Sequence, residues 1–143
     1  MPETARILRA AAQNLTWRGL HTGDQFASPT GALDVCAAIY TAAHGTIPHE
    51  FHTDEVASIA LIEASAPAMA AIRAVSASLE SEPCTTEICP GHEVPDYIEH
   101  VSNWAATAPI NHTEPPTESE VIGRLYRLSH QLAATVPPQR PAA

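Results

Sequence analysis

The sequence predicts an all-α protein, folded as a compact single-domain bundle of about six helices. Apolar residues recur at helical spacing along nearly the whole chain, which is the main signal for helix. A length of 143 residues suits one domain, and 35 large apolar side chains beside 26 alanines can build one modest core. No segment is a convincing strand, and no internal repeat or heptad run is present.

The first predicted helix spans residues 4–18, and Gly19 follows it in a position that commonly ends helices. Residues 19–31 contain three glycines and one proline, so we expect a loop there. A second helix is predicted over 30–44, with Ser28 as its cap and Pro29 in its first turn. Apolar residues cover most of its circumference, which places it near the centre of the fold.

Thr53 is the predicted cap of a helical pattern that Pro67 must interrupt, because proline lacks the N–H donor and clashes one turn back. We therefore expect two helices, over 54–64 and 66–80, followed by an irregular segment over 81–94. Another helix should begin at Pro95 and run to about Ala106.

A capping box, Thr117 to Glu120, predicts a last helix over 118–134. The domain is expected to cover residues 1–134. The proline-rich residues 135–143 are expected to form a disordered tail.

The charge balance excludes several functions. Sixteen acids face seven arginines and no lysine, for a net charge of −9. Such a chain repels phosphate backbones and anionic membranes, so neither nucleic acid nor membrane is an expected partner. Residues 75–123 carry nine acids and no arginine. This stretch is either a solvated face or a docking surface for a cationic partner or a metal.

The compartment expected from the sequence is the cytoplasm. Three cysteines cannot form a complete set of disulfides, and the N-terminus lacks a signal-peptide pattern. No apolar run approaches the length of a membrane span.

Residues 84–92 have the spacing Cys-x4-Cys-x2-His, which offers thiolate and imidazole ligands to zinc. Cys84, Cys89 and His92 would supply three ligands, with His100 or Glu87 as the fourth. The alternatives are an ordinary surface loop and a local Cys84–Cys89 disulfide. No cofactor is expected apart from this zinc alternative.

Two further places are candidate ligand-binding sites. His21, Asp24 and Gln25 lie in the glycine-containing loop, where a ligand can approach the backbone. Glu63 falls on the apolar face of its helix, so we expect it to be buried and paired with Arg18 or Arg73. In a cleft, such a carboxylate would instead be a candidate acid–base group.

Two stretches, Gly19-Leu-His-Thr-Gly-Asp-Gln-Phe26 and Gly31-Ala-Leu-Asp-Val-Cys-Ala-Ala-Ile-Tyr-Thr-Ala-Ala-His-Gly45, resemble a family of small uncharacterised proteins from high-GC actinomycetes. The resemblance covers about residues 4–80 and, more loosely, 95–108. It implies a compact helical fold and transfers no catalytic residue.

The sequence favours a non-catalytic module that binds a protein partner or regulates one, through the acidic region or an apolar groove between helices. The alternative is a small-ligand or zinc-binding protein that uses the 19–31 loop or the cysteine–histidine cluster. No residue is assigned a catalytic role. Self-association into a homodimer is also expected, because an alanine-rich chain covers its core poorly.

Overall fold

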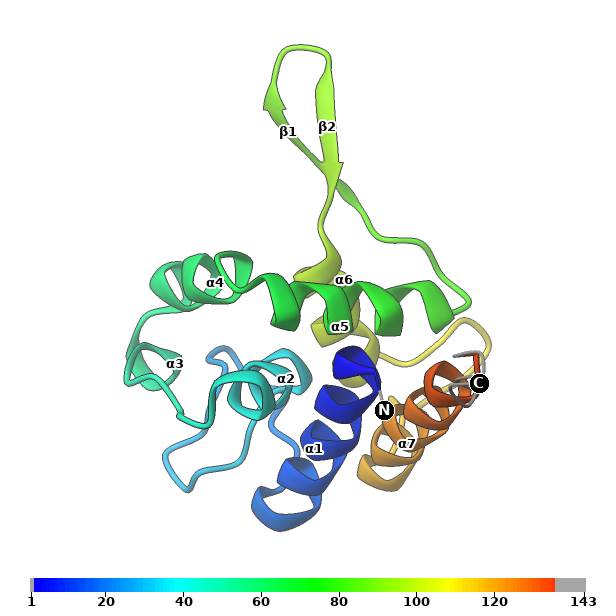
Figure 1. Ribbon diagram of the computed structural model, residues 1–143. Helices are drawn as coiled ribbons and strands as arrows, with labels where there is room; N and C mark the ends of the chain where they lie inside the picture. Colours follow the sequence, from blue (N-terminus) through cyan, green and yellow to red (C-terminus); the bar gives the residue numbers. More distant parts are fainter. Residues whose placement is uncertain (1, 136–143) are drawn as a thin grey trace, which may run out of the picture.

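The computed structural model describes residues 2–135, which form seven helices and one two-stranded sheet (Figure 1). The elements follow in the order α1 (Glu3–Arg18), α2 (Val35–His44), α3 (Glu50–Thr53), α4 (Glu55–Glu63), α5 (Ala66–Ser78), β1 (Thr85–Cys89), β2 (His92–Pro95), α6 (Tyr97–Ala106) and α7 (Glu118–Ala134). The predicted disordered tail lies outside the described residues from position 136 onward.

The predicted all-α fold is wrong, because β1 and β2 pair as an antiparallel hairpin in the segment expected to be irregular. β1 is rich in β-branched residues, and the strands are joined by Pro90 and Gly91 alone. Gly91 has φ of +81°, a conformation that favours glycine. This proline–glycine turn closes the hairpin, which projects away from the helices (Figure 1).

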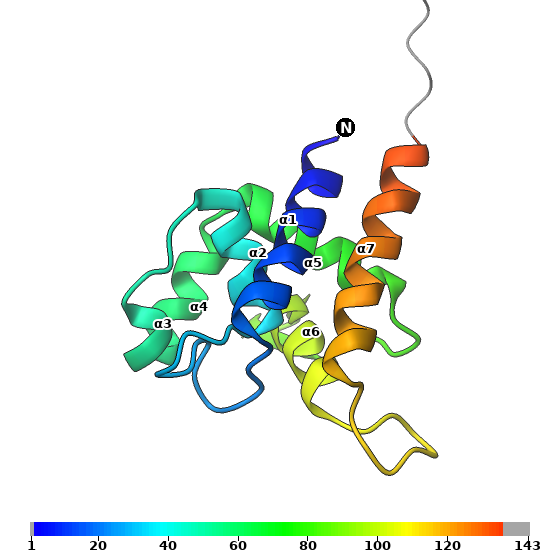
Figure 2. The ribbon, with the colours of Figure 1, turned by 90° about the horizontal axis from the view of Figure 1, so that it is seen from below.

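Helix α2 is central, as predicted, and its first five residues, Val35 to Ile39, are fully buried. It packs against α1, α5 and α6, while α1 also lies along α7 (Figure 2). Its start differs from the prediction, since Asp34 caps the helix by accepting from the Cys36 N–H at 2.8 Å. Ser28 instead closes a local turn by accepting from the Ala32 N–H at 3.0 Å.

The predicted break near Pro67 is confirmed. Ser65 separates α4 from α5 and caps α5 by accepting from the Ala68 N–H. Within residues 2–135, no single helix is long and apolar enough to cross a membrane. Among the described helices, only α4 and α5 taken together, bent by 96°, reach that length and composition.

The capping box at Thr117 is confirmed as well, since its hydroxyl accepts from the Glu120 N–H and α7 spans Glu118–Ala134. The Glu118 carboxylate accepts from the Leu20 N–H at 2.9 Å. This bond ties the beginning of α7 to the end of α1.

Candidate functional site

The hairpin has two chemically different faces. Thr86 and Val94 are register partners, and both line a groove beside the helices together with Ile88. Glu87 and Glu93 form the next register pair. Because successive side chains of a strand point to opposite faces, these two carboxylates lie on the face turned away from the groove. We call the two sides the apolar face and the acidic face of the hairpin.

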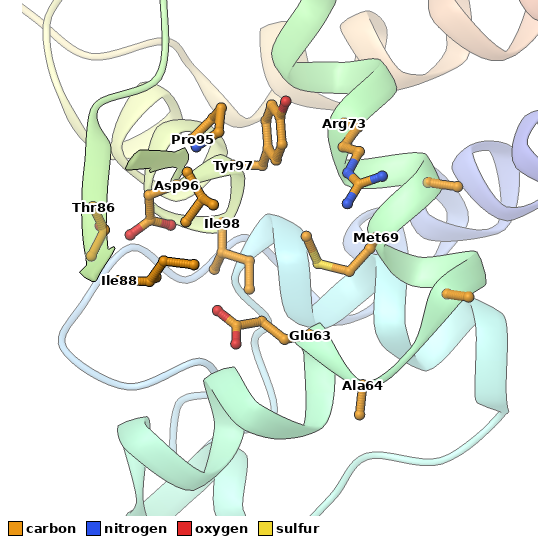
Figure 3. A pocket seen from close by; sticks show the side chains of 13 residues that line it. Glu63, Ala64, Met69, Arg73, Thr86, Ile88, Pro95, Asp96, Tyr97 and Ile98 are labelled. Carbon is orange, nitrogen blue, oxygen red and sulfur yellow. The ribbon is translucent and has the colours of Figure 1, made fainter. Parts of the chain in front are cut away.

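The groove, which has a volume of about 940 Å³, lies between the apolar face of the hairpin, the α4–α5 junction and the start of α6 (Figure 3). Met69 and Ile98 contribute apolar surface from α5 and α6. Glu63, Arg73 and Asp96 add charged groups around them. The groove therefore combines an apolar lining with two carboxylates and one guanidinium.

Three interactions hold the walls of this groove. Asp96 caps α6 by accepting from the Glu99 N–H at 3.0 Å, and its own N–H donates to the Cys84 carbonyl at 2.8 Å. The base of the hairpin is thereby fixed to α6. The Arg73 guanidinium lies 5.5 Å from the centre of the Tyr97 ring, a cation–π contact that joins α5 to α6.

The predicted burial of Glu63 is wrong, because this last residue of α4 is exposed. Only Ser58 and Ile62 of this short helix are buried, so the face that Glu63 shares is not covered. Its carboxylate instead points into the groove under the hairpin (Figure 3). A ligand-binding role for Glu63 stays a prediction, now at this groove.

The hairpin separates the cysteines that were expected to share a zinc ion. Cys84 pairs with Asp96 at the base, whereas Cys89 pairs with His92 at the tip. Five residues of extended chain place the cysteines roughly 15 Å apart, too far for a common metal or a disulfide. No group of three or more His, Cys, Asp or Glu side chains placed to hold a metal ion occurs within residues 2–135.

His100, the proposed fourth ligand, is buried and has both ring nitrogens in hydrogen bonds. Nδ1 lies 2.6 Å from the Ser76 hydroxyl, and Nε2 lies 2.8 Å from the Ser81 hydroxyl. These contacts connect α5, α6 and the segment that leads into β1. The geometry gives His100 a structural role beneath the hairpin.

His21, Asp24 and Gln25 stay together in the glycine loop but do not line the groove under the hairpin. A Cβ on Gly23 would lie 2.7 Å from His21 Cε1, so the imidazole packs directly over this glycine. Asp24 is exposed, and Gln25 Oε1 is buried without a hydrogen-bond partner in the described part of the chain. Ligand binding at this loop stays a prediction.

One polar cluster was missed from the sequence. Asp34 Oδ1 accepts from the Cys36 N–H and from the Ser102 hydroxyl at 3.1 Å. Burial raises the pKa of Asp34 to about 6. Burial, and secondarily the charge of Asp34, raises the pKa of the Cys36 thiol well above its usual value. A sealed, protonated thiol is a poor nucleophile, so this cluster is structural. Asp34 was visible as a helix-capping residue type, but its partner Ser102 was not.

A family model, described as a family of unknown function and designated DUF6197, matches residues 1–131. The chain belongs to this family. No curated protein and no solved structure matches the chain. The expected resemblance to an uncharacterised family is therefore confirmed.

Proposed function

We propose that this DUF6197 chain is a non-catalytic protein-binding module, and that the groove under the hairpin receives an apolar segment of a cationic partner. The observation that carries the proposal is the exposed apolar face of the hairpin. Ile88 is 66% exposed and Val94 is 40% exposed, on the side that overhangs Met69 and Ile98. Covering such side chains is favourable, and apolar surface of this kind marks interaction sites.

The instability of a lone hairpin supports a partner. A two-stranded hairpin is marginally stable unless one face packs on something else. Every residue of β1 and β2 is exposed, so neither face is covered by any other part of residues 2–135. A segment lying in the groove would cover the apolar face and stabilise the hairpin.

The charges around the groove favour a basic partner. Glu63 and Asp96 line it, and Glu87 and Glu93 lie on the opposite face of the same hairpin. Among the described residues that line the groove, Arg73 is the one base, and its guanidinium is already held over Tyr97. Complementary charge speeds association and selects among partners.

Binding is better supported than catalysis because the two side chains with raised pKa values do not line the groove. Asp34 and Cys36, whose pKa values are raised, are buried at the start of α2 and do not line it. A catalytic acid, base or nucleophile needs access to its substrate.

Selection of random peptides displayed on phage, using the full chain as bait, tests this proposal. We expect enriched peptides to combine apolar and basic residues. Their affinity should fall about tenfold in I88S or V94S, which is the equivalent of about 1.4 kcal/mol of lost apolar contact. I110S is the matched control, because Ile110 is 90% exposed but does not line the groove. No enrichment, or equal binding to I88S, V94S and I110S, would overturn the proposal.

A further inference from the structure

We infer that the partner segment binds as an additional β-strand along the outer edge of β1, and that its residues alternate between apolar and basic. This inference rests on the proposed function and specifies the partner. The sheet contains two strands, so β1 and β2 each have one edge that no strand of the described chain pairs with. Extended segments commonly bind by adding to such an edge.

The hydrogen-bond pattern of the hairpin indicates which edge is better equipped. In an antiparallel ladder, hydrogen-bonded pairs alternate with pairs whose N–H and C=O groups point outward. The Asp96 N–H bonds to the Cys84 carbonyl, so the pairs of Thr85 with Pro95 and of Glu87 with Glu93 are the outward ones.

β1 therefore presents two N–H donors and two carbonyl acceptors, from Thr85 and Glu87. The corresponding residues of β2 are Glu93 and Pro95, and proline has no N–H to donate. A β-bulge between Glu87 and Cys89 interrupts the ladder toward the tip. The docking edge is thus the short stretch of β1 nearest the helices, directly beside the groove.

The two faces of the hairpin define the side chains of the incoming strand. Its residue opposite Thr86 lies on the apolar face, beside Ile88 and Val94, and should be apolar. Its residue opposite Glu87 lies on the acidic face. There Glu87 and Glu93 are direct cross-strand neighbours, an unfavourable pairing of like charges that an added cation relieves.

The same charges argue against a second copy of this chain as the occupant. Pairing β1 with β1 of another molecule would bring further glutamates onto the acidic face, which already holds two. A Lys- or Arg-bearing strand is the complementary partner.

The test uses a capped peptide of alternating valine and lysine that carries a fluorescent label. Its binding to the full chain is measured by fluorescence anisotropy. Two further peptides carry N-methyl groups, one on the valine amides and one on the lysine amides, because alternate amides of a strand point to opposite edges. If the peptide adds as a strand at the edge of β1, only one of the two N-methylated peptides should lose affinity. A glutamate-for-lysine peptide should not bind, and E87Q should weaken the valine–lysine peptide roughly threefold. E114Q, which removes an exposed carboxylate outside the hairpin, should leave its affinity unchanged.

The outcomes separate the two proposals. Equal loss from both N-methylated peptides would indicate a bound helix, and equal retention would indicate contact through side chains alone. Either result overturns strand addition but leaves the proposal of groove binding intact. The same holds if phage-selected peptides bind and the valine–lysine peptide does not. A dimer of the free chain that the peptide dissociates would assign the edge to a second copy, which also overturns the inference. Failure of all peptides overturns the proposed function itself.

Discussion

Ser102 of α6 donates a hydrogen bond of 3.1 Å to Oδ1 of Asp34, the residue that caps α2, across 68 positions of sequence. The same carboxylate oxygen accepts from the Cys36 N–H at 2.8 Å. One buried carboxylate thus begins the central helix and joins it to the helix that supports the hairpin.

Replacing Ser102 by alanine is expected to lower the free energy of unfolding by about 1–2 kcal/mol, because a buried carboxylate loses a hydrogen-bond donor. The pKa of Asp34 should rise further, since the bond from Ser102 lowers it. Urea unfolding of S102A against S119A, which removes an exposed serine hydroxyl, measures the effect. Equal stability of the two variants would contradict a structural role for this bond.

Asp34 should make stability fall as the pH rises from about 4 to 7. Its pKa is raised from 3.8 to about 6 in the folded protein, so the folded state holds this proton in a range where the unfolded state has released it. D34N keeps an oxygen that can accept from the cap but removes the charge. The stability of D34N relative to the parent chain should therefore rise with pH, by up to about 3 kcal/mol.

Urea unfolding at pH 4 and pH 7 checks this prediction. D54N is the control, because Asp54 caps α4 in the same way, accepting from the Ala57 N–H, but is exposed. A parallel pH profile for D34N and D54N would show that burial of Asp34 has no electrostatic cost.

His100 is expected to be a strong stability determinant. H100A leaves a cavity and deprives the buried Ser76 hydroxyl of its partner, for a loss of roughly 2–4 kcal/mol. S81A removes only the second contact, at an exposed residue, and should cost less. Thermal unfolding of both variants makes the comparison, and a larger loss in S81A would refute this order.

Gly91 should affect the stability of the hairpin but not that of the helical core. A side chain at φ of +81° is strained, so G91V should increase amide exchange in residues 85–95. The midpoint of thermal unfolding should hardly change, because β1 and β2 bury no side chain in the core. A large fall in that midpoint would mean that the hairpin supports the helices.

The three thiols should differ in reactivity. Cys84 and Cys89 are exposed and should react quickly with a thiol reagent, whereas buried Cys36 should react only after unfolding. A reagent that releases one chromophore for each thiol, used in buffer and in denaturant, counts the exposed thiols and then all three. Fewer than two fast thiols in fresh protein would indicate that Cys84 and Cys89 are linked, against the separation that the hairpin imposes.

Local signals predicted much of the helical structure. The capping box at Thr117 and the break before Pro67 act within one turn of helix, so the sequence alone was sufficient for them. The start of α2 was predicted wrongly, because Ser28 was taken as the cap and Asp34 as a residue within the helix. Leu33 forms isolated bridges with Leu20 and Ala27, which keep this segment extended and leave Asp34 as the cap.

The candidate site was harder to predict because it depends on pairing. The acidic composition of the region was visible, but an irregular loop and a hairpin place its charges differently. Only the register of the two strands places Glu87 opposite Glu93 and directs Thr86, Ile88 and Val94 toward the groove. The helical spacing that suggested burial of Glu63 did not reveal that its face of α4 lacks a covering element.

The exposed hairpin also has an evolutionary consequence. A substitution in β1 or β2 alters the surface offered to other molecules without requiring compensating changes among the packed helices. Natural selection can therefore lengthen or shorten this hairpin, or change its charges, while the helical scaffold stays constant. For the same reason, an engineer could graft a foreign hairpin between α5 and α6.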